Sequence, residues 1–323
     1  MEKGPLIVLT GPTAVGKTEA AISLAKRCNG EIISADSMQV YRNMDIGTAK
    51  ISPEETQGIP HYMIDELEPD EEFNVFLFQK KAKVYIEDIY ARGKLPILVG
   101  GTGFYIQAVL YDIAFTEEKK ALQSPRDSSS SIREKLQEQA RTCGSAALYQ
   151  KLLDVDPDYA KTVHENNVKR IIRALEYHAL TGKTFSSHNE EQKKKTSPYC
   201  YVYFVLNMNR EALYQKIDRR VDAMIQEGLI EEVQHLLDLG YKRSLVSMQG
   251  LGYKEIAAAL CGECSMEEAI AVLKRDTRHF AKRQLTWFRR EKEICMIEKD
   301  HFPSNEKLVD ELLMIAREKG VLR

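Results

Sequence analysis

Short, mostly apolar runs separated by longer stretches of mixed character dominate the first hundred residues, and such a run returns near residue 200. Their length and β-branched or aromatic content are typical of strands buried in a sheet. The predicted strands are 6–9, 31–35, 95–99 and 199–206. Helical periodicity follows two of them, at 18–25 and 74–92. Strands that alternate with helices predict an α/β protein, with a three-layer core around a mostly parallel sheet.

This pattern changes in the middle of the chain. Residues 117–131 are charged and Ser-rich, several helical segments follow to about Gly182, and a second polar connector covers 186–197. Polar connectors at both ends of a helical stretch indicate a domain inserted into the core. We therefore predict a discontinuous α/β core, residues 1–112 and 199–323, and an all-helical insertion, residues 113–198.

Composition limits the class of protein. The 323 residues are 43% hydrophobic and 29% charged, with a formal net charge of -2, as in an ordinary soluble protein. Without a global positive charge, any nucleic-acid site must be a local patch. Six scattered cysteines, no long apolar span and no signal-like start predict a reduced, cytoplasmic protein without a membrane segment. Cys261 and Cys264 lack a second Cys or His pair at metal-ligand spacing, so we interpret them as incidental thiols.

The first predicted strand leads directly into a glycine-rich loop with the pattern G-x-x-x-x-G-K-T. This loop consists of Gly11, Pro12, Thr13, Ala14, Val15, Gly16, Lys17 and Thr18. Because a helical run follows, its backbone N–H groups are expected to converge on phosphate oxygens at a helix N-terminus. Lys17 adds a positive charge, and the hydroxyl of Thr18 can bind Mg²⁺. A mere glycine turn needs neither residue, so the loop predicts a site for a diphosphate or polyphosphate.

Two more polar segments follow predicted strands at the same sheet edge. Asp36 follows the run 31–35, and residues 100–102, Gly-Gly-Thr, follow the run 95–99. In open α/β sheets this edge faces the ligand. Asp36 could be a general base, a magnesium ligand or only an N-cap, and position alone does not decide. An ATPase or GTPase would usually have an acidic residue where Thr102 and the glycines stand, so we expect these to contact a different ligand, although a tight turn would also explain them.

Basic residues stand out at three places, one of them a single arginine. Arg220 shares a helix face with Ile217 and Met224, so its guanidinium needs either a core carboxylate or a bound diphosphate. The other two places are helix faces that carry Lys169, Arg170 and Arg173, and Arg275, Arg278, Lys282 and Arg289. A single basic face is more often solvated surface than an RNA site. Together, the two faces are consistent with two sides of a cleft for a polyanion.

These motifs resemble the bacterial tRNA dimethylallyltransferases over nearly the whole chain. The matching motifs are G-P-T-A-x-G-K-T at 11–18, D-S-x-Q-x-Y at 36–41, M-D-I-G-T-A-K at 44–50, G-G-T at 100–102, K-R-x-x-R-A-L-E at 169–176, G-Y-K at 252–254 and A-K-R-Q-x-T-W at 281–287. The sequence departs from the family at Val15, where a small residue is usual, and at Glu165, where Pro is usual. Only the shape of the diphosphate pocket is put in question by Val15.

The resemblance implies transfer of a dimethylallyl group from dimethylallyl diphosphate to the N6 amine of adenosine 37, next to the anticodon of tRNA, with release of diphosphate. The adenine is flipped out of the anticodon loop to reach the donor. By this resemblance Asp36 accepts a proton from the amine and Thr102 helps to position the reacting groups. Lys17, Arg220 and Thr18 with Mg²⁺ stabilise the departing diphosphate.

The resemblance also implies the partners, which are dimethylallyl diphosphate and the anticodon stem-loop of tRNA. The implied tRNA contacts are Asp36, Ser37, Met38, Gln39, Thr102, Arg133, Lys169, Arg170, Ile171, Ile172, Arg173, Gln249, Gly250, Leu251, Gly252, Tyr253, Lys254, Lys282, Arg283, Gln284, Leu285, Thr286, Trp287, Phe288 and Arg289. We expect a cytoplasmic monomer that does not bind a membrane.

Three other classes share part of the pattern. A small-molecule kinase would have the same phosphate loop and sheet, and it would couple ATP to a substrate at Asp36. A noncatalytic RNA-binding module would keep the basic faces but would not need the loop. An isopentenyltransferase acting on free adenine nucleotides would not need the insertion or the basic helix. The acceptor that labelled dimethylallyl diphosphate alkylates, tRNA, AMP or ATP, separates these classes.

Overall fold

The computed structural model describes residues 3–115 and 127–322. These residues form two compact units, 1–110 with 198–323 and 111–197. The predicted boundaries, 112/113 and 198/199, differ from these by two residues and by one. In the described residues, no helix is long and apolar enough to cross a membrane.

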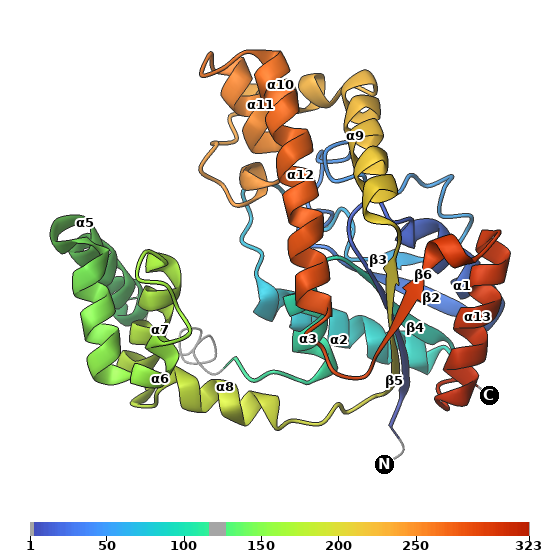
Figure 1. The fold of residues 1–323 in the computed structure, drawn as a ribbon, viewed down its shortest axis with the longest axis horizontal. Coiled ribbons are helices and arrows are strands. Elements are labelled where there is room, and N and C mark those ends of the chain that lie inside the picture. Colours follow the sequence, from blue (N-terminus) through green and yellow to red (C-terminus); the bar gives the residue numbers. More distant parts are fainter. Residues whose placement is uncertain (1–2, 116–126, 323) are drawn as a thin grey trace. The chain divides into compact units, whose positions relative to one another are not determined.

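The first unit contains a six-stranded sheet in which every pairing is parallel, in the order β3-β2-β4-β1-β5-β6 (Figure 1). Its strands are β1 (Pro5–Thr10), β2 (Gly30–Ala35), β3 (His61–Tyr62), β4 (Leu95–Gly100), β5 (Cys200–Asn207) and β6 (Ile294–Glu298). Leu6, Ile7, Val8 and Leu9 of β1 are completely buried, as expected for a central strand covered on both faces. The predicted α/β class with a mostly parallel sheet is confirmed.

Helices cover both faces of this sheet. The first layer consists of α1 (Lys17–Cys28) and α13 (Asn305–Glu318), and the second of α2 (Val75–Ala91) and α3 (Gly103–Leu110). A further group of helices follows β5 and lies beyond the carboxyl ends of the strands (Figure 1). It contains α9 (Arg210–Gln226), α10 (Leu229–Asp238), α11 (Tyr253–Leu260) and α12 (Met266–Phe288), with a 3₁₀ turn at Ser247–Gln249. A second 3₁₀ turn, Lys299–His301, follows β6.

The second unit is helical in its described elements and has its own core. Its helices are α5 (Asp127–Val155), which is interrupted at Gly144, α6 (Pro157–Ala160), α7 (Val168–Thr181) and α8 (Phe185–Lys193). Leu148 and Leu152 of α5 pack with Ile171 and Leu175 of α7 in a buried cluster. Asn167 caps α7 by accepting a hydrogen bond from the N–H of Arg170, and Gly182 ends the helix in a left-handed conformation.

Candidate active site

The phosphate loop joins β1 to α1 at the carboxyl edge of the sheet. Gly16 caps α1 with φ 94°, a conformation that favours glycine. Gly11 lies so close to β5 that a Cβ would stand 2.4 Å from the carbonyl oxygen of Leu206. Val15, the departure from the family pattern, has a completely buried side chain. The strand, loop and helix predicted from the sequence are therefore all present, in that order.

The ammonium of Lys17 lies against the phosphate loop. It donates hydrogen bonds to the carbonyls of Gly11, at 3.0 Å, and Pro12, at 2.9 Å. Burial lowers the pKa of Lys17 to about 8; the positive charge of Arg220 adds to this fall, and the carboxylate of Asp36 opposes it. A diphosphate placed beside the ammonium would favour the charged form, so this lysine can respond directly to an anionic ligand.

A cavity of about 150 Å³ opens from the loop. Its polar lining includes Lys17, Thr18, Asp36, Gln39, Arg220 and Gln284. Its apolar lining includes Ala14, Ala21, Ile32, Ile51, Ile64, Val99 and Phe280. Strand ends, loop and helices from distant parts of the sequence therefore enclose one space with a cationic part and an apolar part.

Asp36 lines this cavity and also shapes the backbone that follows β2. Its Oδ1 accepts a hydrogen bond of 2.8 Å from the N–H of Met38, which forms an Asx turn. No helix begins at this turn, so Asp36 is not the N-cap considered from the sequence. Among the described residues, its Oδ2 has no hydrogen-bond partner in the protein. The carboxylate thus has one oxygen fixed by the local turn and one oxygen available to a ligand.

Arg220 reaches the same cavity from α9. Burial lowers the pKa of Arg220, and the charge of Asp36 acts in the opposite direction. In the part of the chain that the structure describes, its guanidinium forms neither an ion pair nor a hydrogen bond. Of the two partners considered from the sequence, a core carboxylate is therefore not seen. A cation held without a paired anion in a partly buried cavity is suited to bind an anionic ligand.

The glycine turn after β4 forms another side of the cavity, through Gly100 and Gly101. Gln284 of α12 is 6% exposed and holds this turn, because its Nε2 donates to the carbonyl of Gly101 at 3.0 Å. Thr102 is half-buried and does not line the cavity. Its N–H donates to the carbonyl of Ala35 at 3.1 Å, and its own carbonyl accepts a hydrogen bond from the first turn of α3. The turn itself is thus a cavity wall, while Thr102 stands one residue beyond it.

Comparison with known proteins decides the family. A family model named IPP transferase matches residues 39–291, and one named isopentenyl transferase matches residues 5–71. A tRNA dimethylallyltransferase of Lachnoclostridium phytofermentans is 58% identical over 319 residues, which is 99% of each chain. This chain belongs to the IPP transferase family. The resemblance predicted from the motifs is confirmed.

Solved structures of IPP transferases extend this likeness to three dimensions. A tRNA delta(2)-isopentenylpyrophosphate transferase of Staphylococcus epidermidis is 44% identical, with a TM-score of 0.71, and covers 98% of this chain and 100% of its own. A eukaryotic dimethylallyltransferase acting on tRNA is 30% identical, with a TM-score of 0.83, and covers 98% of this chain and 79% of its own. The shared fold therefore includes the insertion as well as the core.

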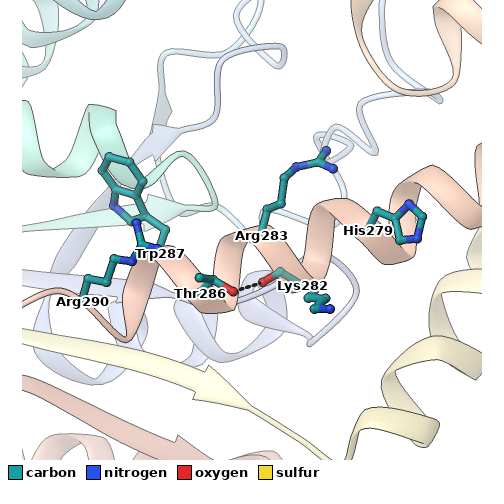
Figure 2. Close-up of a pocket in the computed structure, with 6 residues that line it drawn as sticks. All are labelled: His279, Lys282, Arg283, Thr286, Trp287 and Arg290. Carbon is teal, nitrogen blue, oxygen red and sulfur yellow. Dashed lines mark hydrogen bonds between the residues drawn. The ribbon is translucent and has the colours of Figure 1, made fainter. Parts of the chain in front are cut away.

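Helix α12 of this IPP transferase carries several of the expected tRNA contacts on its exposed side. His279, Lys282, Arg283, Thr286, Trp287 and Arg290 line an open cavity of about 440 Å³, which we call the α12 surface (Figure 2). Both Lys282 and Thr286 lie within α12, and the Thr286 hydroxyl donates a hydrogen bond of 2.9 Å to the carbonyl of Lys282. The α12 surface combines three Lys or Arg side chains with one indole ring, a combination suited to RNA phosphates and bases.

Other predicted contacts on the same helix point inward. Phe288 is completely buried, which corrects its assignment as a tRNA contact. Gln284 is nearly buried but lines the active-site cavity, so its assignment stays a prediction. The basic face predicted for this helix, with Arg275, Arg278, Lys282 and Arg289, also has fewer unpaired charges than expected. Arg278 pairs with Asp218 at 2.5 Å, and Arg275 pairs with Asp276 at 2.9 Å, so both charges are balanced within the protein.

The expected contacts at 249–254 divide in the same way. Gln249 is exposed, although its amide donates to the carbonyl of Arg243 at 2.6 Å. Gly252 and Tyr253 are buried, and the Tyr253 hydroxyl donates to Glu232 at 2.6 Å. Burial raises the pKa of Tyr253, and the Glu232 carboxylate adds to the rise. The side chain of Tyr253 is therefore structural, which corrects its assignment as a tRNA contact.

Within the insertion, the structure separates exposed cations from core residues. Lys169 and Arg170 are exposed at the start of α7. Ile171 and Ile172 belong to the buried cluster, so their side chains are not available to RNA, which corrects the prediction. Arg133 pairs at 2.6 Å with Glu176, whose side chain is 6% exposed, and therefore balances a nearly buried charge.

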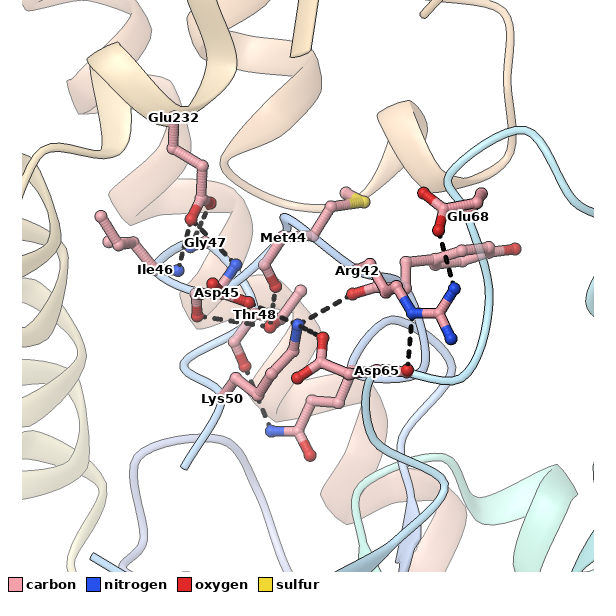
Figure 3. Close-up of polar contacts among 12 residues, drawn as sticks. Arg42, Met44, Asp45, Ile46, Gly47, Thr48, Lys50, Asp65, Glu68 and Glu232 are labelled. Atoms are coloured by element: carbon pink, nitrogen blue, oxygen red, sulfur yellow. Dashed lines mark hydrogen bonds and ion pairs between the residues drawn. The ribbon is translucent and has the colours of Figure 1, made fainter. Parts of the chain in front are cut away.

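Sequence reasoning missed Glu232. This residue lies on α10, and its carboxylate accepts hydrogen bonds from the backbone of residues 45–47, 185 or more positions away (Figure 3). The only local signal is a glutamate in the first turn of an amphipathic helix, which is common on surfaces. Its partners could be found only after the chain was folded.

Proposed function

We propose that this IPP transferase transfers a dimethylallyl group from dimethylallyl diphosphate to the N6 amine of adenosine 37 in tRNA and releases diphosphate. One observation carries the proposal: a single cavity is lined by the phosphate loop, the Asp36 carboxylate and the Arg220 guanidinium. The relative from Lachnoclostridium phytofermentans supports it, since that protein is named a tRNA dimethylallyltransferase at 58% identity over 99% of each chain.

In the proposed reaction, the bond from the allylic C1 to the diphosphate oxygen breaks and a bond from the adenine nitrogen to C1 forms. The electron pair of the breaking bond goes to the diphosphate, whose negative charge grows. The N–H groups of the phosphate loop, Lys17 and Arg220 bind this charge more strongly in the transition state than in the ground state, and so lower the barrier.

The adenine amine must lose a proton as the new bond forms. Its lone pair is delocalised into the ring, so a carboxylate that accepts its hydrogen bond both orients the amine and removes the proton. Asp36 is proposed for this role, because its Oδ2 has no other partner among the described residues while Oδ1 is held by Met38. Thr102, one residue beyond the cavity wall, is proposed to help position the reacting groups.

Magnesium is part of the proposal. Thr18 lines the cavity next to Lys17 and offers a hydroxyl oxygen. In the described residues, no group of three or more His, Cys, Asp or Glu side chains could hold a metal by itself. This donor set fits Mg²⁺, which is usually held by one or two protein oxygens, waters and substrate phosphates. When bound, the ion would neutralise charge on the diphosphate.

For tRNA, we propose that the exposed cations at Lys169, Arg170, Lys282, Arg283 and Arg289 contact phosphates. The target adenine leaves the stack of the anticodon loop to reach the cavity, because its amine is inaccessible while stacked. The proposal includes a cytoplasmic location, where tRNA is modified. It also includes a monomeric protein.

The decisive experiment measures which acceptor is alkylated. The purified protein is incubated with Mg²⁺, labelled dimethylallyl diphosphate and one acceptor at a time: tRNA, the same tRNA with guanosine at position 37, AMP or ATP. We expect label in the tRNA with adenosine 37 and in none of the others. Label in AMP or ATP would assign the chain to the free-nucleotide class, and equal label in the guanosine variant would contradict the proposed target atom.

A further inference from the structure

One wall of the active-site cavity is an irregular segment without helix or strand. Thr48, Ala49 and Ile51 line the cavity from this segment. Residues 45–50 form one tight turn, closed by hydrogen bonds of 2.9 Å from the N–H of Ala49 to Ile46 and from the N–H of Lys50 to Asp45. Ala49 has φ 47°, so the turn ends as helices often do, with a left-handed residue. Like the start of a helix, the turn leaves its first N–H groups without internal partners.

Glu232 satisfies all of these N–H groups with one carboxylate (Figure 3). Its Oε2 accepts from Asp45 and Ile46, both at 2.8 Å. Its Oε1 accepts from Gly47 at 3.1 Å and from the Tyr253 hydroxyl at 2.6 Å. Four donors on one carboxylate are a strong, charge-assisted anchor between α10 and the turn.

Contact with the neighbouring helices allows little freedom at this anchor. A Cβ on Gly47 would lie 2.5 Å from the ring of Tyr253, so the turn is pressed against α11. On the other side, Gln39 reaches the carbonyls of Thr48 and Ala49 only at 3.3 Å each. Lys50, at the end of the turn, pairs with Asp45 at its start and with Asp65 outside it, both at 2.5 Å. Glu232 therefore holds the first N–H groups of the turn, and Lys50 ties its two ends together.

The wall held in this way borders the apolar part of the cavity, and the diphosphate is expected in the cationic part. The phosphate loop, Lys17 and Arg220 supply the cationic part. Ala49 and Ile51 of the wall, with Ile32 of β2, supply apolar surface. In a donor that carries a diphosphate on a five-carbon group, only the five-carbon group matches this surface. In a cavity of about 150 Å³, the position of the wall determines how long an apolar group can be.

We propose that Glu232 is a positioning residue that fixes the 45–51 wall, and so makes the enzyme select a five-carbon donor over longer prenyl diphosphates. This inference rests on the proposed function, and it concerns the donor end of the same site. Glu232 does not touch the substrate; it acts through the turn. Loss of the carboxylate leaves three backbone donors without partners, so the wall moves outward to reach water. Among the described residues the hydrogen bonds of Glu232 go to this turn and to Tyr253, so the phosphate loop keeps its geometry.

The test compares Glu232→Ala and Glu232→Gln with Glu231→Ala. Glu231 is the matched control, because it is an exposed glutamate in the same helical turn. For each protein, kcat and KM are measured for dimethylallyl and geranyl diphosphate at saturating tRNA, and the Kd of inorganic diphosphate is measured by calorimetry. In Glu232→Ala we expect the preference for the five-carbon donor, as a ratio of kcat/KM values, to fall at least about tenfold, mainly through KM.

Glu232→Gln should change the ratio in the same direction, because its amide nitrogen would face N–H donors. The Kd of inorganic diphosphate should stay within about twofold of the unmodified value in all three variants. A ratio in Glu232→Ala equal to that in Glu231→Ala overturns the inference, and so does a loss of diphosphate affinity as large as the loss of donor affinity.

Amide hydrogen exchange keeps the inference testable if Glu232→Ala is less stable. We expect faster exchange at residues 45–47 and unchanged exchange in β1 and α1. Equal acceleration everywhere, together with an unchanged donor ratio in Glu232→Gln, would assign Glu232 to general stability and overturn the inference. A wild-type protein that alkylates no tRNA would instead contradict the proposed function, so the two failures are distinguishable.

Discussion

The side-chain carbonyl of Gln284 accepts a hydrogen bond of 2.9 Å from the backbone N–H of Thr13. Through its amide nitrogen the same side chain donates to the carbonyl of Gly101 at 3.0 Å. A Cβ on Gly101 would lie 2.2 Å from that nitrogen, so a larger residue there would displace the amide of Gln284. One carboxamide from α12 thus joins the phosphate loop to the glycine turn after β4. The exposed side of the same helix carries the α12 surface, including Lys282 and Arg283.

Replacing Gln284 should disturb the donor site. In Gln284→Ala, the N–H of Thr13 and the carbonyl of Gly101 lose their partner, which we expect to cost about 1–3 kcal/mol of unfolding free energy. The phosphate loop is no longer held against the turn, so the Kd of dimethylallyl diphosphate should rise about tenfold. Chemical denaturation and calorimetry measure the two effects.

Lys282→Ala is the matched control for this prediction, because its exposed side chain leaves α12 on the other side. It should weaken tRNA binding and leave the Kd of the donor unchanged. If both variants weakened only tRNA binding, Gln284 would be an RNA contact after all, and the structural assignment would be wrong.

Asp36→Asn isolates the charge of the proposed base. The Asn Oδ1 can still accept from the N–H of Met38, so the local turn is kept. We expect the single-turnover rate of alkyl transfer to fall by about 100- to 10,000-fold, while tRNA affinity changes much less. Loss of the Asp36 charge should lower the pKa of Lys17 further, because this carboxylate opposes the fall. The rate should therefore be measured near pH 7 rather than at higher pH, where Lys17 would lose its charge. An unchanged rate would refute the assignment of Asp36 as the base.

Lys17 should make donor binding depend on pH. In the free protein its pKa is lowered to about 8, so the ammonium is charged below pH 8 and neutral above it. A bound diphosphate favours the charged form, so binding above pH 8 takes up a proton. Affinity for dimethylallyl diphosphate should be flat below pH 8 and fall by up to about tenfold per pH unit above it. Calorimetry in two buffers of different ionisation enthalpy measures the proton uptake.

Lys17→Arg tests the cause, because a guanidinium stays charged throughout this range. The variant should show little decline of affinity between pH 8 and 9.5, whatever its absolute Kd. A decline equal to that of the unmodified protein would mean that another group titrates.

The parts of the site that could be predicted are those whose signal is local. The strand, loop and helix around Lys17 follow one another in sequence, and the helical spacing of Arg220 with Ile217 and Met224 placed its guanidinium inward. By contrast, the anchor at Glu232 joins residues about 186 positions apart, and no pattern near either end indicates the other. Its existence depends on how α10 packs against the 44–51 segment, which is a tertiary property.

The wrong tRNA contacts have a different origin. A motif treats consecutive residues as one group, but successive side chains on a helix point about 100° apart. In α7, Lys169 and Arg170 face solvent while Ile171 and Ile172 face the core. In α12, Arg283 is exposed and Phe288 is buried. Helical periodicity within each motif would have separated the two kinds of residue, because the apolar positions repeat every three or four residues.

The salt dependence of tRNA affinity should separate free cations from paired ones on α12. Each phosphate contact releases counterions, so the slope of log affinity against log salt falls by roughly one for each cation that is removed. Lys282 and Arg283 are exposed, and among the described residues neither forms an ion pair, so the double variant Lys282→Gln with Arg283→Gln should reduce the slope by roughly two. Arg278→Gln is the matched control, because Arg278 is already paired with Asp218, and its slope should match that of the wild-type protein.

Filter binding or fluorescence titration with full-length tRNA at several salt concentrations measures these slopes. A slope lost equally in Arg278→Gln would show that RNA displaces the internal ion pair, and an unaltered slope in the double variant would remove the α12 surface from the tRNA interface.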